Sequence, residues 1–274
     1  MNIEKFLNEY FAGKKEIVIV FHGGDAHTDD IASAGLLGIL LEKAGMPYRF
    51  IRSGDPEVIE TADIAVDVSR KYDKIRYWDH HHLRTKEDGG IRENGIPRSS
   101  FGLLADFFGE DLCGSKEANE YFITTLAWAI DAYDNGLDPM EGTIEDFNPL
   151  SIGGLFELFK KNLGEEKTED ELFALSVPIA KAIIQRVILR AQSLVPVAEA
   201  LKKAADEAGD KQYLILEEGS DVWKDIAIPP QFLYVLYPSK HGALGKWRSV
   251  CVPKAPGSFK NRKSFPKEWA GSGE

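Results

Sequence analysis

The sequence predicts an α/β fold in which a parallel sheet carries helices on both faces. The first observation is a β-branched apolar run over residues 16–21, which ends at His22-Gly23-Gly24. The second is a segment from residue 28 or 29 to about 44, where small and apolar residues recur at helical spacing before Gly45. The third is a series of further strand-like runs at 48–52, 64–68 and 75–78. Strands that alternate with helical segments favour a parallel sheet with helices on both faces.

The second half of the chain predicts helices followed by a smaller α+β domain. Helices are expected near residues 101–108 and 117–130, and the alanine- and leucine-rich residues 170–208 have the pattern of one or two long helices. Three strand-like runs follow, at residues 213–217, 232–237 and 247–252. We therefore expect a larger domain over residues 1–190, a helical connector over 191–210 and a smaller domain over 211–274.

The composition indicates a soluble and acidic protein. The formal net charge of -11 argues against broad electrostatic adhesion to long nucleic acid, although residues 240–267 are basic. No segment approaches the roughly 18 apolar residues of a membrane span, and the first residues contain no signal-type apolar region, so we expect a cytoplasmic protein with no membrane contact. The two cysteines, Cys113 and Cys251, are too few for a disulfide framework or a thiolate metal site.

Histidines and aspartates gather where the predicted strands end. Five of the six histidines form two clusters, His22 with His27 and the run His80-His81-His82. Because the carboxyl ends of parallel strands meet at one edge of a sheet, we expect these imidazoles and the neighbouring carboxylates to share a crevice. Imidazole and carboxylate without thiolate suit manganese, magnesium or zinc. Two such ions about 4 Å apart can activate a water and neutralise a leaving oxygen in phosphoryl chemistry.

Four segments in the same order resemble the motifs of the MYG-type exonucleases, within the DHH phosphoesterase superfamily. That superfamily includes RecJ, the oligoribonuclease and cyclic-dinucleotide phosphodiesterases, and the family II pyrophosphatases. The segment 22–30 resembles the first MYG motif, Asp67 after its strand the second, and Asp79-His80-His81 the superfamily signature. The segment 130–136 is similar to the fourth motif, and residues 247–253 and 262–269 are similar to the C-terminal region of the family.

The resemblance implies a set of metal ligands and catalytic residues in this chain. It makes the larger domain catalytic and the smaller one substrate-binding, with Asp67 bridging two metal ions. Asp79, His80 and His81 are implied as catalytic, one histidine on a metal and the other nearer the substrate phosphate. In the fourth motif either Asp131 or Asp134 is a ligand, and the likeness of 134–136 to the Asp-Thr-Gly of oligoribonucleases favours Asp134. The implied metal ligands are His22, His27, Asp29, Asp67, His80, Asp134 and Asp131.

Several other residues have two competing interpretations. Asp30 could orient a ligand imidazole or act as a first-turn helix carboxylate. Ser99 and Ser100 could cap a helix or receive a phosphate at its N-terminus, where Arg98 could join them. His241 and Arg248 could bind substrate phosphate or lie on an ordinary surface. Four aromatic residues could stack on bases, although core packing is the better interpretation for most of them: Trp223, Tyr234, Tyr237 and Trp247.

The sequence thus predicts a metal-dependent phosphodiesterase, a 3′–5′ exonuclease acting on RNA or short single-stranded oligonucleotides. Its expected cofactors are two divalent ions, Mn²⁺ first, with Mg²⁺ or another divalent ion as alternatives. A second hypothesis is hydrolysis of a small phosphate compound such as pyrophosphate, a cyclic dinucleotide or a nucleotide monophosphate, which the net acidity favours. A third, of another class, is a non-catalytic metal- or nucleotide-binding module. The protein could also form a homodimer.

Overall fold

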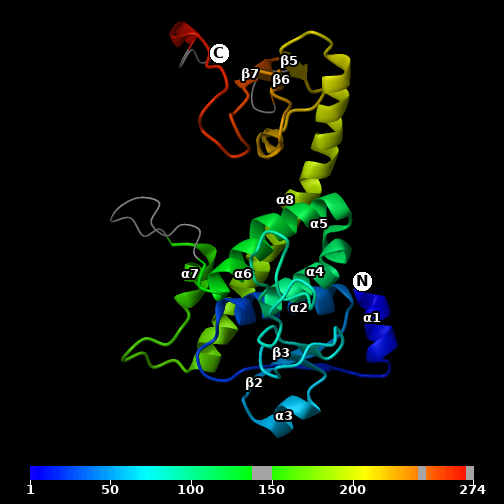
Figure 1. Cartoon of the computed structure of the whole chain (residues 1–274), viewed down its shortest axis with the longest axis vertical. Helices are drawn as coiled ribbons and strands as arrows, with labels where there is room; N and C mark the ends of the chain where they lie inside the picture. Colours follow the sequence, from blue (N-terminus) through cyan, green and yellow to red (C-terminus); the bar gives the residue numbers. More distant parts are fainter. Residues whose placement is uncertain (138–149, 240–244, 270–274) are drawn as a thin grey trace. The chain divides into compact units, whose positions relative to one another are not determined.

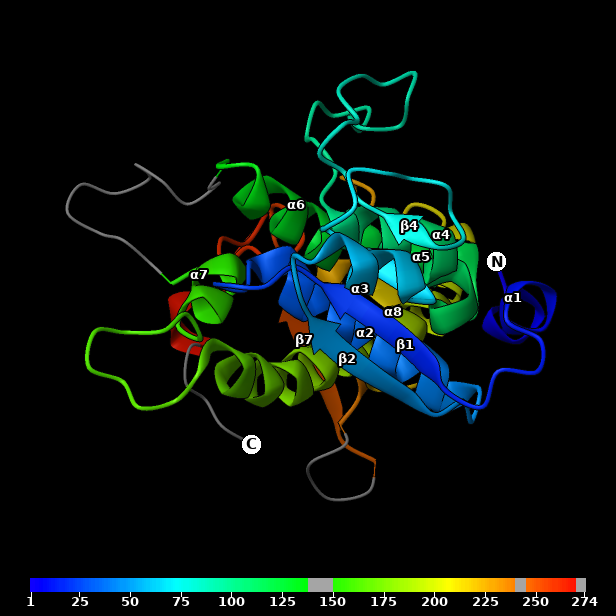
Figure 2. The same cartoon turned by 90° about the horizontal axis from the view of Figure 1, so that it is seen from below.

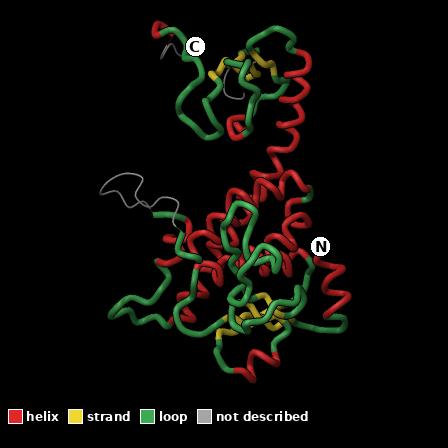
Figure 3. The backbone as a smooth tube through the Cα atoms, in the orientation of Figure 1, coloured by secondary structure: helices red, strands yellow, loops and turns green. Residues whose placement is uncertain are grey.

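The structure is a computed structural model that describes residues 1–137, 150–239 and 245–269. The chain divides into two compact units, residues 1–189 and residues 190–274. The long helix α8 (Glu169–Glu207) belongs to both, with its first half in one unit and its second half in the other (Figures 1 and 3).

The first unit is built on a four-stranded, all-parallel sheet. Its strands are β1 (Ile17–Phe21), β2 (Tyr48–Arg52), β3 (Ile64–Val66) and β4 (Tyr77–Trp78), in the order β2-β1-β3-β4. The predicted α/β fold with a parallel sheet is therefore confirmed. β3 is shorter than predicted because Asp67 takes a left-handed backbone with a φ of 53°, which ends the strand.

Helices cover both faces of this sheet. On one face α3 (Pro56–Thr61) packs Ile59 against Val20 and Ala65 (Figure 2). On the other face lie α2 (Thr28–Lys43) and α4 (Ser100–Cys113), as Figures 1 and 2 show. α2 is buried on nearly all sides, and a Cβ on its Gly35 would lie 2.9 Å from the Cβ of Ala180 in α8. That close approach explains why a residue without a side chain stands there.

The remaining helices of this unit surround α2 and α4. They are α1 (Ile3–Tyr10), α5 (Lys116–Phe122), a π-helical turn (Ile123–Ala127), α6 (Trp128–Asp134) and α7 (Ile152–Glu157). The sequence predicts one helix over 117–130, whereas the structure has two helices joined by the π turn. α1, α3 and α7 were not predicted; α3 and α7 have only six residues each, too short for a clear apolar period.

Helix α8 is long and apolar enough to cross a membrane by length and composition, the one such helix in the described part of the chain. Of its most apolar 18-residue window, 39% is buried inside the protein. Phe173, Ala180 and Ile184 are among its buried residues, at the spacing of one helix face. A core helix with one such face meets the same criteria.

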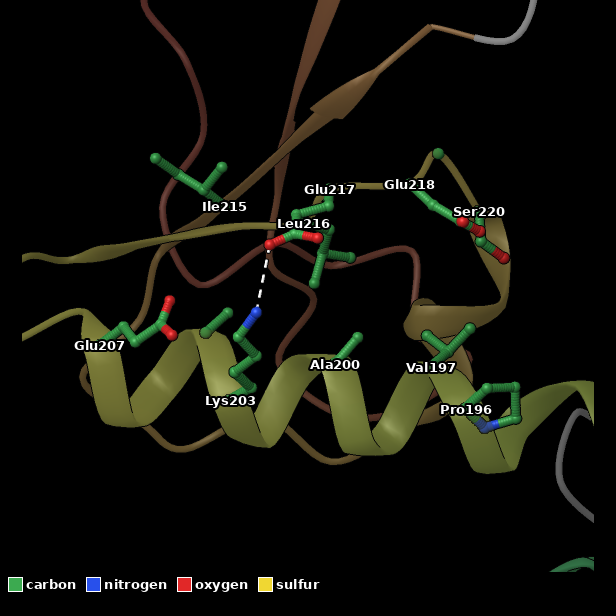
Figure 4. Close-up of a pocket in the computed structure, with 12 residues that line it drawn as sticks. Pro196, Val197, Ala200, Lys203, Glu207, Ile215, Leu216, Glu217, Glu218 and Ser220 are labelled. Carbon is green, nitrogen blue, oxygen red and sulfur yellow. Dashed lines mark hydrogen bonds and ion pairs between the residues drawn. The ribbon is translucent and has the colours of Figure 1, made fainter.

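The second unit contains a three-stranded sheet packed on the second half of α8. The strands are β5 (Tyr213–Ile215), β6 (Tyr234–Pro238) and β7 (Trp247–Cys251); β5 and β6 run parallel, β6 and β7 antiparallel. Two 3₁₀ turns, Asp221–Asp225 and Lys267–Trp269, complete it. A pocket of about 420 Å³ lies between α8 and the segment after β5, where Lys203 pairs with Glu217 at 3.2 Å (Figure 4).

Candidate metal centre

The predicted His and Asp residues meet at the carboxyl edge of the parallel sheet. His22 directly follows β1, Asp67 follows β3, and Asp79 to His81 follow β4. The N-terminal end of α2 brings Asp29 and Asp30 to the same edge, and the C-terminal end of α6 brings Asp134. Parallel strands create this convergence because their carboxyl ends all lie on one side of the sheet.

One group of donors joins the end of β1, the end of β3 and the start of α2. Ligand atoms of His22, His27, Asp30 and Asp67 all lie within 4.8 Å of one another. Nδ1 of His22 lies 2.8 Å from the carbonyl oxygen of Gly23, which leaves Nε2 as the ligand atom. Nε2 lies 2.6 Å from Oδ2 of Asp30, which also accepts the backbone N–H of His27 at 2.9 Å. Asp30 is thus both the helix carboxylate and the imidazole partner that the sequence allowed.

Two further groups share members with the first. Asp29, His80 and Asp134 form one, and Asp67, His80 and His81 form the other. Nε2 of His80 lies 3.3 Å from Oδ1 of Asp67 and 3.5 Å from Oδ2 of Asp134. Asp67 therefore belongs to two groups and His80 to two, so that the three groups form one continuous cluster. Asp67 thus links the group at the end of β1 to His80 and His81.

Asp79 lies beside the cluster and belongs to none of the three groups. Its Oδ1 accepts hydrogen bonds from the backbone N–H and from Nδ1 of His81, both at 2.9 Å. Its Oδ2 accepts the backbone N–H of Arg70 at 2.7 Å. Asp79 thus joins the loop after β3 to the loop after β4 through these hydrogen bonds.

Crowded carboxylates and their imidazole partners shift one another's pKa values. Burial, together with neighbouring carboxylates, raises the pKa of Asp29, and burial raises that of Asp134 to about 6 despite the opposing charge of His80. Burial lowers the pKa of His22, but the close Asp30 carboxylate outweighs it and raises the value to about 9. Hydrogen bonds to Asp67 and Asp79 raise the pKa of His81 to about 10. The cluster therefore retains protons that a bound cation would displace.

The donor set fits divalent metal ions. Oδ1 of Asp29 and Oδ1 of Asp30 are buried and have no hydrogen-bond partner among the described residues. Buried polar atoms without partners are costly, so their presence at a cluster of oxygen and nitrogen donors indicates a ligand. Hard carboxylate oxygens with imidazole nitrogens and no thiolate suit Mn²⁺, Mg²⁺ or Zn²⁺.

Asp131 does not join the cluster, in contrast to its expected place among the alternative ligands. Its Oδ2 lies 2.7 Å from Nε of Arg92, and its Oδ1 accepts hydrogen bonds from the backbone N–H and the hydroxyl of Ser99 at 2.9 and 2.7 Å. Burial raises the pKa of Asp131, yet these three donors suit an ionised carboxylate, and we assign it as ionised. A Cβ on Gly102 would lie 2.1 Å from Oδ1, so Asp131 also fills the space beside that glycine.

The serines and the arginine before α4 have different roles. Ser99 caps α4, as its alternative interpretation predicted, and accepts the N–H of Gly102. Ser100 instead contacts the cluster: its hydroxyl donates to Asp67 at 2.9 Å and its N–H donates to Asp29 at 3.1 Å. Arg98 is bound to Asp106 at 2.7 Å and to the carbonyl of Gly89, away from the three groups.

The predicted substrate residues of the second unit divide into surface, core and undescribed positions. His241 lies outside the described residues. Arg248 is exposed on β7. Trp223 and Tyr237 are buried, as core packing predicted, whereas Tyr234 is half-buried and Trp247 is exposed.

Arg70 is a candidate functional residue that the sequence did not reveal. It lines a cavity of about 280 Å³ at the cluster, together with His22, His27, Asp67 and His81. Its backbone is left-handed, with a φ of 54°. No described residue pairs with its guanidinium, which is the kind of group that binds phosphate oxygens in a fork. Only its nearness to Asp67 in the sequence could have drawn attention to it.

Fold and cluster together define a class: an α/β protein with a His and Asp centre, able to hold divalent metal ions, at the carboxyl edge of a parallel sheet. Within that class the chain belongs to the MYG family, because residues 18–274 match the model of the MYG1 exonuclease family, described as "Uncharacterised protein family (UPF0160)".

Relatives of this family are similar to nearly the whole chain. A MYG1 protein of Schizosaccharomyces pombe is 28% identical over 93% of this chain and 85% of its own length. The human protein named MYG1 exonuclease is 27% identical over 91% of this chain and 73% of its own length. A MYG1 protein of Saccharomyces cerevisiae is 27% identical over 92% of this chain and 83% of its own length. No solved structure matches the chain.

Proposed function

We propose that this protein is a divalent-metal-dependent phosphodiesterase, an exonuclease that removes nucleotides from the 3′ end of RNA or short oligonucleotides. The observation that carries the proposal is the continuous cluster of three donor groups, in which Asp67 joins the first group to the second and His80 joins the second to the third. Relatives named MYG1 exonuclease, among them the human and bovine proteins, support the reaction class. We further propose that the protein acts in the cytoplasm.

The cluster offers places for two ions. His22 and His27 would hold one, Asp29, His80 and Asp134 would hold the other, and Asp67 would be shared. When bound, such ions activate a water, orient a phosphate and neutralise charge on the leaving oxygen. Ser100 would keep Asp67 and Asp29 in place through its hydroxyl and its N–H.

The other residues of the site would bind the substrate and move a proton. His81 is about half exposed, and Nδ1 faces Asp67 and Asp79, so that Nε2 is left for the substrate. With a pKa raised to about 10, its ring is cationic and could donate a proton to the leaving oxygen. The Arg70 guanidinium would bind a non-bridging phosphate oxygen in the same cavity.

A small phosphate compound is the second candidate substrate, favoured by the formal net charge of -11. Two assays in Mn²⁺ separate the alternatives. In the first assay two 5′-labelled short RNAs are compared, one with a free and one with a blocked 3′ end, so that their shortening reports exonuclease activity and its polarity. In the second assay, release of phosphate from pyrophosphate tests the alternative. Degradation of RNA from the free 3′ end is expected; hydrolysis of pyrophosphate alone would replace the exonuclease proposal with the second candidate.

The metal assignment is tested with His80→Ala and Asp67→Asn, and with His82→Ala as the control. His82 is exposed and belongs to none of the three groups. Mn²⁺ binding, measured by calorimetric titration, and RNA turnover should both be lost in the first two variants and retained in His82→Ala. Near-normal turnover of His80→Ala and Asp67→Asn in saturating Mn²⁺ would refute the assigned centre.

A further inference from the structure

The three-stranded sheet of the second unit has one face in the core and one face outside it. Leu214, Val235 and Tyr237 lie in the core with Leu201 and Ala204 of α8. Side chains alternate along a strand, so the paired residues in between point away from that core. The register places these residues on the outer face: Ile215, Tyr234, Leu236, Trp247 and Ser249.

Two aromatic sites lie on this outer face, at Tyr234 and at Trp247. The ring of Phe265 stacks on that of Tyr234, with centroids 5.1 Å apart and planes 11° from parallel, and Trp269 lies 5.9 Å beyond Phe265. Trp247 is 55% exposed and Trp269 64% exposed. Cys251 pairs with Tyr234 and lies four positions after Trp247 in the same strand, so the two aromatic sites lie about 14 Å apart along the sheet.

The segment that carries Trp247, Phe265 and Trp269 is basic, in an otherwise acidic protein. Residues 245–269 contain seven lysines and arginines, at 246, 248, 254, 260, 262, 263 and 267, against one acidic residue, Glu268. Lys263 and Lys267 flank Phe265, and Lys246 precedes Trp247; within the described residues none of their ammonium groups forms an ion pair. Nζ of Lys211 lies 5.9 Å from the ring of Tyr213, at the β5 side of the sheet.

The segment that carries Phe265 is fixed to the unit by Arg262. The guanidinium of Arg262 donates to the carbonyl oxygens of Ile228, Pro229 and Phe232. Its backbone N–H donates to the carbonyl of Val252 at 2.9 Å. The aromatic and basic residues of the outer face are therefore held by the fold. The pocket on the α8 side of this sheet is different, because Glu207, Glu217 and Glu218 line it (Figure 4).

We propose that the outer face of this sheet binds single-stranded nucleic acid. Bases would stack on the exposed rings of Trp247 and Trp269, because every base offers a π face to an exposed ring. Lys246, Lys263 and Lys267 would neutralise phosphates, and their charge is opposite to that of a nucleic-acid backbone. The inference rests on the proposed function, since it gives an exonuclease a second place at which to hold its strand.

The test measures the binding of a fluorescein-labelled 12-nucleotide single-stranded RNA to the full chain. Fluorescence anisotropy in EDTA is the readout. Wild-type protein is expected to bind it more tightly than the matching duplex. Trp247→Ala should weaken binding by ~10-fold, as expected for one lost base–aromatic stack, with no change in the salt dependence. Lys263→Gln combined with Lys267→Gln should lower the slope of log K against log salt by about 1.4, or about 0.7 per phosphate contact.

Tyr10→Ala is the control, because Tyr10 is an exposed aromatic residue of α1 in the other unit, and it should bind RNA as the wild type does. Thermal unfolding of each variant checks that it is folded. Equal affinity of Trp247→Ala and wild type, or no binding of single-stranded RNA by the wild type, overturns the proposal. Binding in EDTA does not depend on catalysis, so the hydrolysis of bis(p-nitrophenyl) phosphate by wild-type protein in Mn²⁺ tests the proposed function separately.

Discussion

Replacing Asp134 by asparagine should stabilise the metal-free protein while removing its activity. The side chain of Asp134 is 9% exposed, among the carboxylates of Asp29, Asp30 and Asp67. Burial raises its pKa from the ordinary 3.8 to about 6, so that the folded protein binds a proton more tightly than the unfolded chain between those values. The ionised carboxylate therefore opposes folding at high pH, by an upper limit of about 3 kcal/mol.

The sign of the pH dependence follows from that rise. Below about pH 4 Asp134 is protonated in both states and costs nothing; as the pH rises through 6 the folded metal-free protein loses stability. Asparagine is neutral throughout, and its amide oxygen can still accept a hydrogen bond from Asp29. We expect Asp134→Asn to raise the unfolding midpoint at pH 8 by roughly 4 to 8 °C, for a gain of about 2 kcal/mol in a unit of this size.

Asp131 provides the matched control, three residues earlier in the same helix. Asp131→Asn removes one charge-assisted hydrogen bond of the buried Arg92, which keeps Asp106 as a partner, so it should destabilise the protein by about 2 kcal/mol. The assay is thermal unfolding in EDTA at pH 4.5 and 8, followed by Mn²⁺ titration at pH 8. If Asp134→Asn destabilised the metal-free protein at pH 8, or bound Mn²⁺ as the wild type does, the assignment of Asp134 to the centre would be refuted.

Three further predictions concern metal, substrate and packing. Mn²⁺ at 100 times its Kd should stabilise the wild type by about 2.7 kcal/mol, whereas Asp67→Asn should show little of this gain in thermal unfolding. Arg70→Gln should raise KM for RNA by ~10-fold with unchanged Mn²⁺ affinity, since it loses one charge-assisted phosphate contact. The control is Arg84→Gln, because Arg84 is an exposed arginine outside the cavity. Equal KM values for the two variants would exclude the role of Arg70. Gly102→Ala should destabilise the protein by about 2 kcal/mol, because its Cβ would lie 2.1 Å from Oδ1 of Asp131, and an unchanged unfolding midpoint would contradict this packing argument.

The sequence predicts the parallel sheet and the convergence of its strand ends because both follow from local patterns. The apolar run before His22 predicts a strand, and the helical spacing after it predicts a helix. Parallel pairing of the strands then brings His22, Asp67 and His80 together. The choice between Asp131 and Asp134 could not be settled in this way. Their spacing of three residues allows both to share a helix face, and the π turn at Ile123–Ala127 that precedes them leaves no clear sequence signal. Only the partner of each side chain, Arg92 or His80, separates them.

The cluster buries several acidic side chains, and this burial costs the metal-free protein stability. Asp29, Asp30 and Asp67 are 0%, 1% and 5% exposed, and burial raises the pKa of Asp29 and Asp30, which means that their ionised forms are unfavourable in the folded chain. The fold compensates in part: Ser100 donates a hydroxyl and an N–H from the first turn of α4, where the helix dipole also favours negative charge. Asparagine in place of Asp29 or Asp30 would remove that cost, as Asp134→Asn is expected to show at its own position. A cation bound at these carboxylates would offset this cost, because its charge turns their repulsion into binding energy.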